Sequence, residues 1–347
     1  MKLNFSDEDR KRWDFFCHDI LSKNERFTEL LAEYLNRTPR LISARMVKNL
    51  ARECSLSEDI AFRVLLASAI GLDILQNAED KELEKQYLLP SLHRLDPKDW
   101  QRDAYLTTID FPLALTGNWA FGTERYAPYE PFVCGLPKMT DTGREIPQLG
   151  YFTSSYSFPA VRENGIEWMA VKPNEIATMH EPIQKARGKT VAFGLGLGYF
   201  AFHASQKETV AEVVIVERDQ AIIDLFSKYL LPQFPHREKI RLVQSDAFDF
   251  AEKKLPMENA DFAFVDLWHD QSDGLPLYLR MRRLEILCSD TEFSYWIEPI
   301  LLSALRGMVL DRITDDGPGE IYTFDEARTL LTDSYLRSLA PKIQKIE

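Results

Sequence analysis

A glycine-rich turn is the first feature of the sequence that could take part in chemistry. The segment Phe193-Gly194-Leu195-Gly196-Leu197-Gly198-Tyr199 follows a short apolar run and precedes a helical pattern. Glycine lets the backbone approach a ligand closely, and the N-terminus of the next helix presents unpaired amide groups that favour an anionic group. We therefore predict that Gly194, Gly196 and Gly198 belong to a ligand-binding turn between a strand and a helix.

Two carboxylates end the next two apolar runs of the sequence. Glu217 follows Val216, and Asp246 stands in Gln244-Ser245-Asp246-Ala247. A carboxylate at a strand end can accept hydrogen bonds from both hydroxyls of a ribose, and a second acid at the same edge can accept one from the exocyclic amine of adenine. The alternative is that Glu217 is a solvated strand end and Asp246 a turn residue.

A third acid, Asp266, ends the fourth apolar run, in Val265-Asp266-Leu267-Trp268-His269-Asp270. An acid at this position can orient an acceptor hydroxyl or amine and take its proton, so Asp266 is the candidate catalytic residue. Together with His269 and Asp270 it has a spacing that could suggest a metal. Three such side chains on a loop are more typical of hydrogen-bonded or solvated groups, and we predict no metal site.

The spacing of other motifs disfavours several common enzyme classes. A dinucleotide-binding turn needs glycine or alanine where Tyr199 stands, and a phosphate-binding loop ending in Gly188-Lys189-Thr190 needs glycine where Ile183 stands. Neither Gly-x-Ser-x-Gly nor His-Glu-x-x-His occurs in the sequence. NAD-dependent enzymes, P-loop NTPases, serine hydrolases and zinc proteases are therefore poor candidates.

The elements that must position these residues are predictable in the same region. Four apolar runs of β type alternate with helical patterns, which is typical of a parallel sheet with helices on both faces. The predicted strands are Thr190–Gly194, Glu212–Glu217, Ile240–Gln244 and Asp261–Asp266, with a fifth at Glu292–Glu298. The predicted helices are Asp219–Leu230, Leu277–Leu287, Pro299–Ile313 and Phe324–Leu339. The fold class is therefore α/β, with a Rossmann-like, doubly wound and mostly parallel sheet that lacks a visible final hairpin.

In this order of features the chain resembles class I S-adenosylmethionine-dependent methyltransferases, and within them the spermidine-synthase-like branch, over about residues 174 to 300. The resemblance implies that the glycines lie against the methionine part of S-adenosyl-L-methionine, that the first acid holds the ribose and that the second reads adenine. The cofactor-binding residues that it implies are Gly194, Gly196, Gly198, Glu217, Asp246 and Ala247. It also implies that the acid matching Asp266 lies near an amine nucleophile.

Two positions depart from the pattern of that family. Ala192 stands two residues before the first glycine, where the family usually has an acid. Leu267-Trp268 stands where many amino methyltransferases have Asn/Asp-Pro-Pro-aromatic, a sequence that binds the reacting nitrogen. Methylation of an amine or a base by that motif is therefore disfavoured.

The resemblance predicts methyl transfer from S-adenosyl-L-methionine to a small-molecule substrate or a protein acceptor. Two alternatives stay open. Aminopropyl transfer from the decarboxylated cofactor is suggested by the pair Asp246 and Asp266. A non-catalytic sensor or scaffold that binds S-adenosylmethionine is suggested by Ala192 and the missing Pro-Pro motif.

At 347 residues the chain is long enough for about two domains. Residues 1–104 have the apolar spacing of helices and predict an α-helical N-terminal domain. Residues 105–173 are rich in aromatic residues and proline and predict a connector of strands and loops, and residues 174–347 predict the cofactor-binding domain. Ser6 with Asp9 and Ser55 with Glu58 predict helix N-termini, and Leu89-Pro90 predicts a break.

The charge balance bears on the partners. The chain has 42 basic and 54 acidic residues, a formal net charge of −12, which disfavours long nucleic acids because they are bound through Lys and Arg. The first residues resemble no signal peptide, and the apolar run Val191–Phe202 is too short to span a membrane. The four cysteines show no metal or redox spacing. We therefore expect a cytoplasmic protein with no membrane or nucleic-acid partner, and a homo-oligomer is left open.

Overall fold

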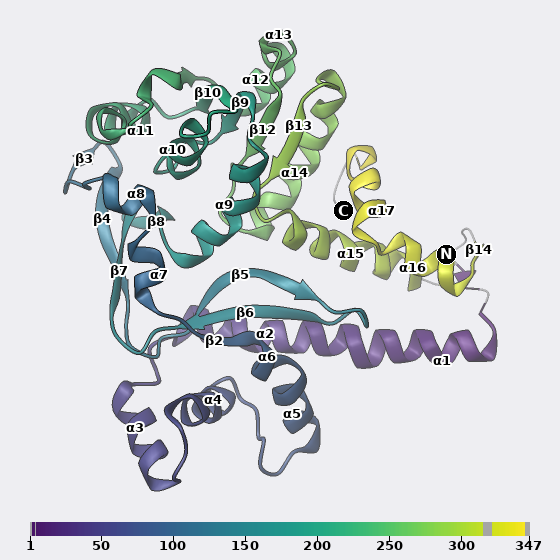
Figure 1. The fold of residues 1–347 in the computed structure, drawn as a ribbon. Coiled ribbons are helices and arrows are strands. Elements are labelled where there is room, and N and C mark those ends of the chain that lie inside the picture. The colour runs from purple at the N-terminus through teal and green to yellow at the C-terminus, as the bar shows by residue number, and fades with distance from the viewer. Residues whose placement is uncertain (1, 4, 315–320, 344–347) are drawn as a thin grey trace. The chain divides into compact units, whose positions relative to one another are not determined.

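The computed structural model describes residues 2, 3, 5–314 and 321–343, and the chain forms two compact units (Figure 1). The sheet unit contains residues 1–5, 102–123 and 159–347, and the helical unit contains residues 6–101 and 124–158. The chain changes unit within strand β4 (Trp119–Tyr126) and again within strand β7 (Tyr156–Glu163). The predicted connector, residues 105–173, is therefore divided between the two units, because its strands pair with different partners.

Five parallel strands form the centre of the sheet unit. They are β9 (Gly188–Phe193), β10 (Val210–Glu217), β11 (Ile240–Gln244), β12 (Phe262–Val265) and β13 (Glu292–Tyr295). Their order in the sheet is β11-β10-β9-β12-β13, and each neighbouring pair is parallel. The predicted Rossmann-like α/β sheet and its five strands are confirmed.

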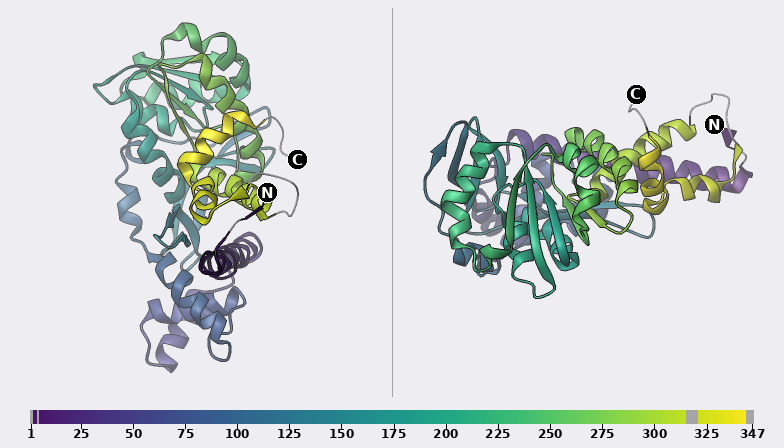
Figure 2. Two further views of the ribbon diagram at one scale, coloured as in Figure 1. Left: turned by 90° about the vertical axis from the view of Figure 1, so that its right-hand side faces the viewer. Right: turned by 90° about the horizontal axis from the view of Figure 1, so that it is seen from above.

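These strands are apolar because both faces of the sheet are covered. The segments 213–216 of β10 and 262–265 of β12 are buried without alternation, as expected for a parallel sheet between two layers of helices. Figures 1 and 2 show helices on both sides of the sheet. The helices of this unit are α8 (Ala104–Thr108), α9 (Pro173–Lys185), α10 (Tyr199–Ser205), α11 (Gln220–Leu225), α12 (Ala247–Lys253), α13 (Leu255–Glu258), α14 (Gln271–Leu284), α15 (Glu298–Thr314), α16 (Phe324–Leu330) and α17 (Asp333–Leu339).

The register of the strands brings their carboxyl ends to one edge. Phe193 of β9 pairs with Val216 of β10 and with Val265 of β12, and Glu217 pairs with Gln244 of β11. The chain enters the sheet at β9, moves outward through β10 and β11, and then crosses to β12 and β13 on the other side. The edge beside β9 is thus the point of reversal at which open α/β sheets bind ligands.

Some predicted helix limits were wrong. The helix predicted to begin at Leu277 begins at Gln271, because the Asp270 side chain caps it by accepting a hydrogen bond from the Ser272 amide at 2.7 Å. The helix predicted over 324–339 is two helices, since Thr332 caps a new one at its hydroxyl. Two smaller sheets also occur. In one, β1 (Lys2–Leu3) pairs in parallel with β14 (Ile321–Tyr322). In the other, β3 (Leu115–Thr116) and β8 (Ile166–Ala170) are the outer strands of a four-stranded sheet with the order β3-β4-β7-β8.

The helical unit combines most of the predicted N-terminal helices with three strands. Its helices are α1 (Asp7–Phe15), α2 (Ser22–Arg37), α3 (Ala44–Glu53), α4 (Glu58–Ala69), α5 (Ala78–Leu83), α6 (Leu89–Ser91) and α7 (Pro97–Gln101). Its strands, β2 (Leu92–Arg94), β5 (Phe132–Met139) and β6 (Glu145–Tyr151), pair in the order β2-β6-β5. Its core includes the buried side chains Phe27, Phe62 and Tyr87.

None of the helices within residues 2–3, 5–314 and 321–343 combines the length and the apolar character that crossing a bilayer demands.

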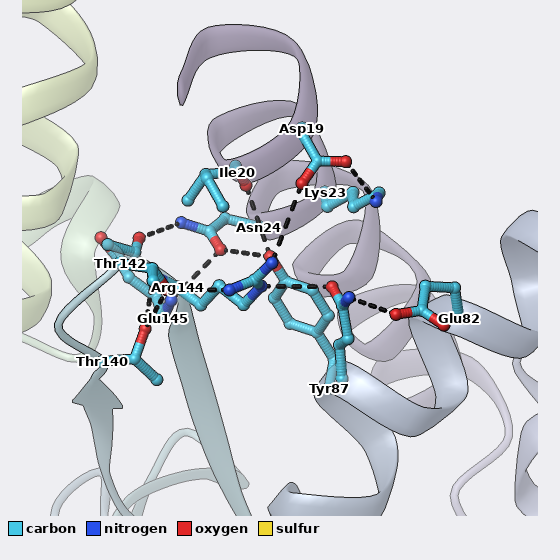
Figure 3. Close-up of polar contacts among 12 residues, drawn as sticks. Asp19, Ile20, Lys23, Asn24, Glu82, Tyr87, Thr140, Thr142, Arg144 and Glu145 are labelled. Carbon is cyan, nitrogen blue, oxygen red and sulfur yellow. Dashed lines mark hydrogen bonds and ion pairs between the residues drawn. The ribbon is translucent and has the colours of Figure 1, made fainter. Parts of the chain in front are cut away.

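A buried polar network ties α2 to the β5–β6 hairpin (Figure 3). The amide of Asn24 donates to the backbone oxygen of Gly143 at 3.0 Å and accepts from the Tyr87 hydroxyl at 2.8 Å and from the Glu145 amide at 3.1 Å. Each buried polar group has a partner, so the network fixes the hairpin on the helix without the cost of an unsatisfied group.

The predicted break at Leu89-Pro90 is wrong. The chain stays helical from Ala78 to Ser91 through a wider π-helical turn, Glu84–Leu88, in which the Leu89 amide bonds to the Glu84 oxygen. The wider turn relieves the clash and the missing donor that proline normally causes inside a helix.

The N-cap of α4 is Ser57, not Ser55 as predicted. The Ser57 hydroxyl accepts from the Ile60 amide at 3.3 Å, whereas Ser55 has a φ of 54°. We expect Ser57→Ala to lower the free energy of unfolding by about 1 kcal/mol, because an orphan amide loses its acceptor. Ser55→Gly should leave it unchanged or raise it, because glycine adopts positive φ without a Cβ penalty. Urea unfolding of both variants checks this, and the reverse order would contradict it.

Candidate functional site

A cavity of about 220 Å³ lies at the carboxyl ends of β9, β10, β11 and β12 in the sheet unit. Six of the seven predicted site residues line it, and they come from the four turns that follow these strands. They are Gly194, Gly196, Glu217, Asp246, Ala247 and Asp266. Gly198 is not among the lining residues; it is the N-cap of α10, with a φ of 75°.

The glycines of the turn make room for protein atoms. All three have positive φ, and a Cβ at Gly194 would overlap the backbone oxygen of Asp266. A Cβ at Gly196 would overlap the sulfur of Met169, and one at Gly198 would overlap the ring of Phe226. The prediction attributed these glycines to the approach of a ligand, but packing within the protein already demands them.

The sequence predicted unpaired backbone amides at this turn, but several of them already donate hydrogen bonds within the protein. The Gly194 amide donates to the Val216 oxygen at 2.9 Å, and the Leu195 amide donates to Oε2 of Glu217 at 3.2 Å. The Leu197 amide lies 3.2 Å from the sulfur of Met169. The turn is therefore held in shape from both sides before any ligand binds.

Glu217 is half-buried and its carboxylate is fixed by three backbone amides. Oε2 accepts from Leu195, and Oε1 accepts from Arg218 at 2.7 Å and from Asp219 at 2.9 Å. A carboxylate has about four acceptor positions. One position remains for a ligand hydroxyl, rather than the two that the ribose prediction assumed.

Asp246 divides its two oxygens between structure and the cavity. Oδ1 caps α12 by accepting from the Phe248 amide at 2.9 Å and from the Asp249 amide at 3.0 Å. Oδ2 has no hydrogen-bond partner in the part of the chain that the structure describes. The helix-cap role and the ligand role are thus compatible in one side chain, and the adjacent Ala247 is buried.

Asp266 shares the cavity with a second acid, Glu175 of α9, which no sequence motif indicated. Burial raises the pKa of Asp266 well above its usual range, and the charge of Glu175 adds to this rise. Burial raises the pKa of Glu175 to about 7; Lys172 opposes this rise and Glu167 adds to it. Two acids with raised pKa values in one cavity are typical of sites that handle protons.

Aromatic side chains form much of the remaining wall. Trp168, Trp268 and Trp296 line the cavity. Trp168 meets the ring of His269 edge-on, with the ring centres 4.0 Å apart. Trp168 belongs to the segment predicted to be an aromatic connector, whereas Trp268 stands where the sequence departs from a family motif. Flat rings beside carboxylates favour a ligand that carries positive charge.

The charged residues that line the cavity also favour a positively charged ligand. The cavity is bordered by five acidic residues and two basic ones. The acids are Glu167, Glu175, Glu217, Asp246 and Asp266, and the bases are Lys172 and Arg218. Lys172 is already paired with Glu167, with Nζ and Oε1 2.5 Å apart. The site therefore has a negative potential that attracts cations.

His269 does not join Asp266 and Asp270 in a cluster. Its Nδ1 lies 3.1 Å from Oδ2 of Asp273. Across residues 2–3, 5–314 and 321–343, no three His, Cys, Asp or Glu side chains are grouped so that they could hold a metal ion.

The chain matches no protein-family model and no curated protein. Among solved structures, it resembles spermidine synthase from Thermotoga maritima, with 16% identity over 40% of this chain and 48% of that one and a TM-score of 0.30. A spermidine synthase in complex with the transition state analogue AdoDATO matches with 17% identity over 40% of this chain and 50% of that one and a TM-score of 0.31. The matched part spans about half the length of either enzyme.

Proposed function

We propose that the cavity binds an S-adenosyl sulfonium donor and that the protein transfers an alkyl group from this donor to an amine. The observation that carries the proposal is the convergence of Glu217, Asp246 and Asp266, from the ends of β10, β11 and β12, on one cavity. Glu217 has one acceptor position for a ribose hydroxyl, and Oδ2 of Asp246 is available to an adenine amine. The negative lining complements a sulfonium.

The charge of the lining favours aminopropyl transfer over methyl transfer. S-adenosylmethionine has a carboxylate near its sulfonium, and in this cavity it would meet Glu175 and Asp266. The decarboxylated donor lacks that group. Methyl transfer remains the second candidate, because Lys172 lines the cavity and could bind a donor carboxylate if it left Glu167.

The bound donor supplies an electrophilic carbon, on which an amine lone pair forms the new C–N bond while the C–S electron pair leaves with sulfur as the thioether 5′-methylthioadenosine. An amine attacks only when it has lost its ammonium proton. Asp266 is the base in this proposal, because a carboxylate with a raised pKa takes a proton more readily at neutral pH. Glu217 and Asp246 hold the nucleoside so that the sulfonium carbon faces the amine.

A pocket for a drug-sized ligand typically measures ~300–1,000 Å³, more than the cavity of about 220 Å³. Binding a whole donor therefore requires a flexible lining side chain to move. Met169 is one such side chain, because its thioether lies over Gly196 and against the Leu197 amide.

Isothermal titration calorimetry with 5′-methylthioadenosine tests the nucleoside site. We expect Glu217→Ala to weaken binding by about 10-fold or more, because a hydrogen bond to a charged group is lost. Glu252→Ala, at an exposed position on α12, is the matched control and should bind as the wild type does. Circular dichroism of both variants checks the fold, since Glu217 also holds three backbone amides.

The reaction class is tested by product analysis with each donor. Decarboxylated S-adenosylmethionine and 1,4-diaminobutane should give 5′-methylthioadenosine. S-adenosylmethionine with the same amine should give no S-adenosylhomocysteine. The opposite pattern would support methyl transfer. Failure of the wild type to bind any of these nucleosides at millimolar concentration would contradict the whole proposal.

A further inference from the structure

Two acids without partners lie in one cavity, Glu175, which is buried, and Asp266, which is half-buried. Glu175 lies in the first turn of α9 and is 9% exposed, and Asp266 directly follows β12. Within the described ranges, neither carboxylate accepts a hydrogen bond or joins an ion pair, whereas Glu217 in the same cavity accepts three hydrogen bonds. Burying a carboxylate without a partner costs free energy. A structural role alone gives no reason for two unpartnered carboxylates in one cavity.

The two acids cannot both be charged at low cost in the free protein. Like charges at a shared site raise each other's affinity for a proton, and the charge of Glu175 adds to the rise in the pKa of Asp266. Burial raises the pKa of Glu175 to about 7, so this acid is partly protonated near neutrality. One proton shared by the pair relieves the repulsion. A cation placed between them relieves it too, and would displace that proton.

The surroundings of the pair select the kind of cation. Lys172 and Glu167, whose charges act on Glu175, form an ion pair in which Nζ and Oε1 lie 2.5 Å apart. A metal ion would need a third ligand, and none groups with this pair within the described part of the chain. Trp268 is 4% exposed and its Nε1 has no acceptor among the described residues. The other charged or titratable lining residues are His269, which pairs with Asp273, and Glu217, Arg218 and Asp246 at the strand ends.

We infer that Glu175 and Asp266 form an ammonium subsite, in which the two carboxylates bind one alkylammonium group together and release their shared proton when it binds. The inference rests on the proposed function and extends it by assigning Glu175. The ammonium group has two sources within that function: the aminopropyl chain of a decarboxylated donor, or the amine acceptor. Two carboxylates and tryptophan rings suit an –NH₃⁺ group, which has three donors and a compact charge.

Calorimetry at pH 7 in two buffers of different ionisation enthalpy, phosphate and Tris, measures the protons released. 5′-Methylthioadenosine has no ammonium group and should release none. The ammonium ligand should release at least about half a proton, because an acid with a pKa of about 7 is half protonated at this pH. Release with decarboxylated S-adenosylmethionine identifies the donor as the source. Release with 1,4-diaminobutane added to the 5′-methylthioadenosine complex identifies the acceptor.

Glu175→Gln separates this role from a structural one. The variant should bind 5′-methylthioadenosine within about twofold of the wild type, lose most of the proton release and bind the ammonium ligand about 10-fold or more weakly. It should fold, because it removes a buried acid that has no partner. Glu252→Gln, at an exposed position on α12, is the control for the change of charge and should behave as the wild type does.

The outcomes distinguish the two proposals. Binding of ammonium ligands without proton release, or unchanged release in Glu175→Gln, overturns the ammonium subsite and leaves the nucleoside site standing. Release with 1,4-diaminobutane in a protein that binds no nucleoside supports the subsite and overturns the proposed transfer. If no ligand binds, both are wrong.

Discussion

Asp266→Asn is expected to lower the turnover of decarboxylated S-adenosylmethionine with 1,4-diaminobutane by about 10²–10⁴-fold, the range typical of removing a general base. Asn cannot take the proton that the amine must lose before it attacks. Initial rates of 5′-methylthioadenosine formation measure the effect. The affinity for 5′-methylthioadenosine itself should change little, because Glu217 and Asp246 hold the nucleoside.

The pH dependence and a surface variant control this prediction. Turnover by the wild type should rise with pH above the usual range of a carboxyl group, because a base acts only after it has lost its proton and burial raises the pKa of Asp266 well above that range. Asp290→Asn, at an exposed position before β13, should keep the wild-type rate. A rate for Asp266→Asn within about threefold of the wild type would show that this carboxylate is not the base.

Gly194→Ala should have the second large effect, on both stability and binding. Gly194 has a φ of 98°, and a Cβ there would overlap the backbone oxygen of Asp266. The unfavourable backbone conformation costs ~1–3 kcal/mol and overpacking another ~1–3 kcal/mol. We therefore expect the free energy of unfolding to fall by about 2–6 kcal/mol. Urea unfolding measures this, and loss of affinity for 5′-methylthioadenosine should accompany it.

Gly307→Ala is the matched control, because Gly307 lies within α15 and a Cβ there would meet no atom within 4 Å. Alanine should stabilise that helix by up to about 1 kcal/mol. Equal effects of the two substitutions would contradict the packing of Gly194 against the Asp266 backbone.

The central sheet could be predicted from the sequence because its physical cause is local. A strand covered on both faces must be apolar at every position, and Val213 to Val216 show that pattern without any knowledge of the neighbours. The strand ends then place Glu217, Asp246 and Asp266 at one edge, because parallel strands share their direction. The sequence therefore indicated the edge at which the cavity lies.

Glu175 could not be predicted, because its importance depends on distant neighbours. The sequence shows an acid in the first turn of a helix after Pro173, a common arrangement that favours the helix dipole. Its position beside Asp266 depends on how α9 packs, which no local pattern records. The sequence shows only that Glu175 lies on the helix that precedes the first strand of the sheet.

The boundaries of the two units could not be predicted either, because they depend on pairing between strands that are far apart in the sequence. β2 pairs with β6, and the residues that pair, Leu92 and Leu149, are far apart in the chain. The aromatic composition of residues 105–173 suggested one connector, but composition does not tell which strands pair. The glycine turn is a further example. Its glycines make positive φ angles predictable from the sequence, but the sequence does not show which atoms fill the space beside them.

The pairing of β1 with β14 bears on the synthesis of the protein. Residues 2 and 3 are synthesised long before Ile321 and Tyr322, with which they pair. The helical unit, residues 6–101 and 124–158, is complete long before that point. The nascent chain can therefore fold the helical unit first, while the sheet unit, in whose sequence the helical unit is inserted, waits for β14.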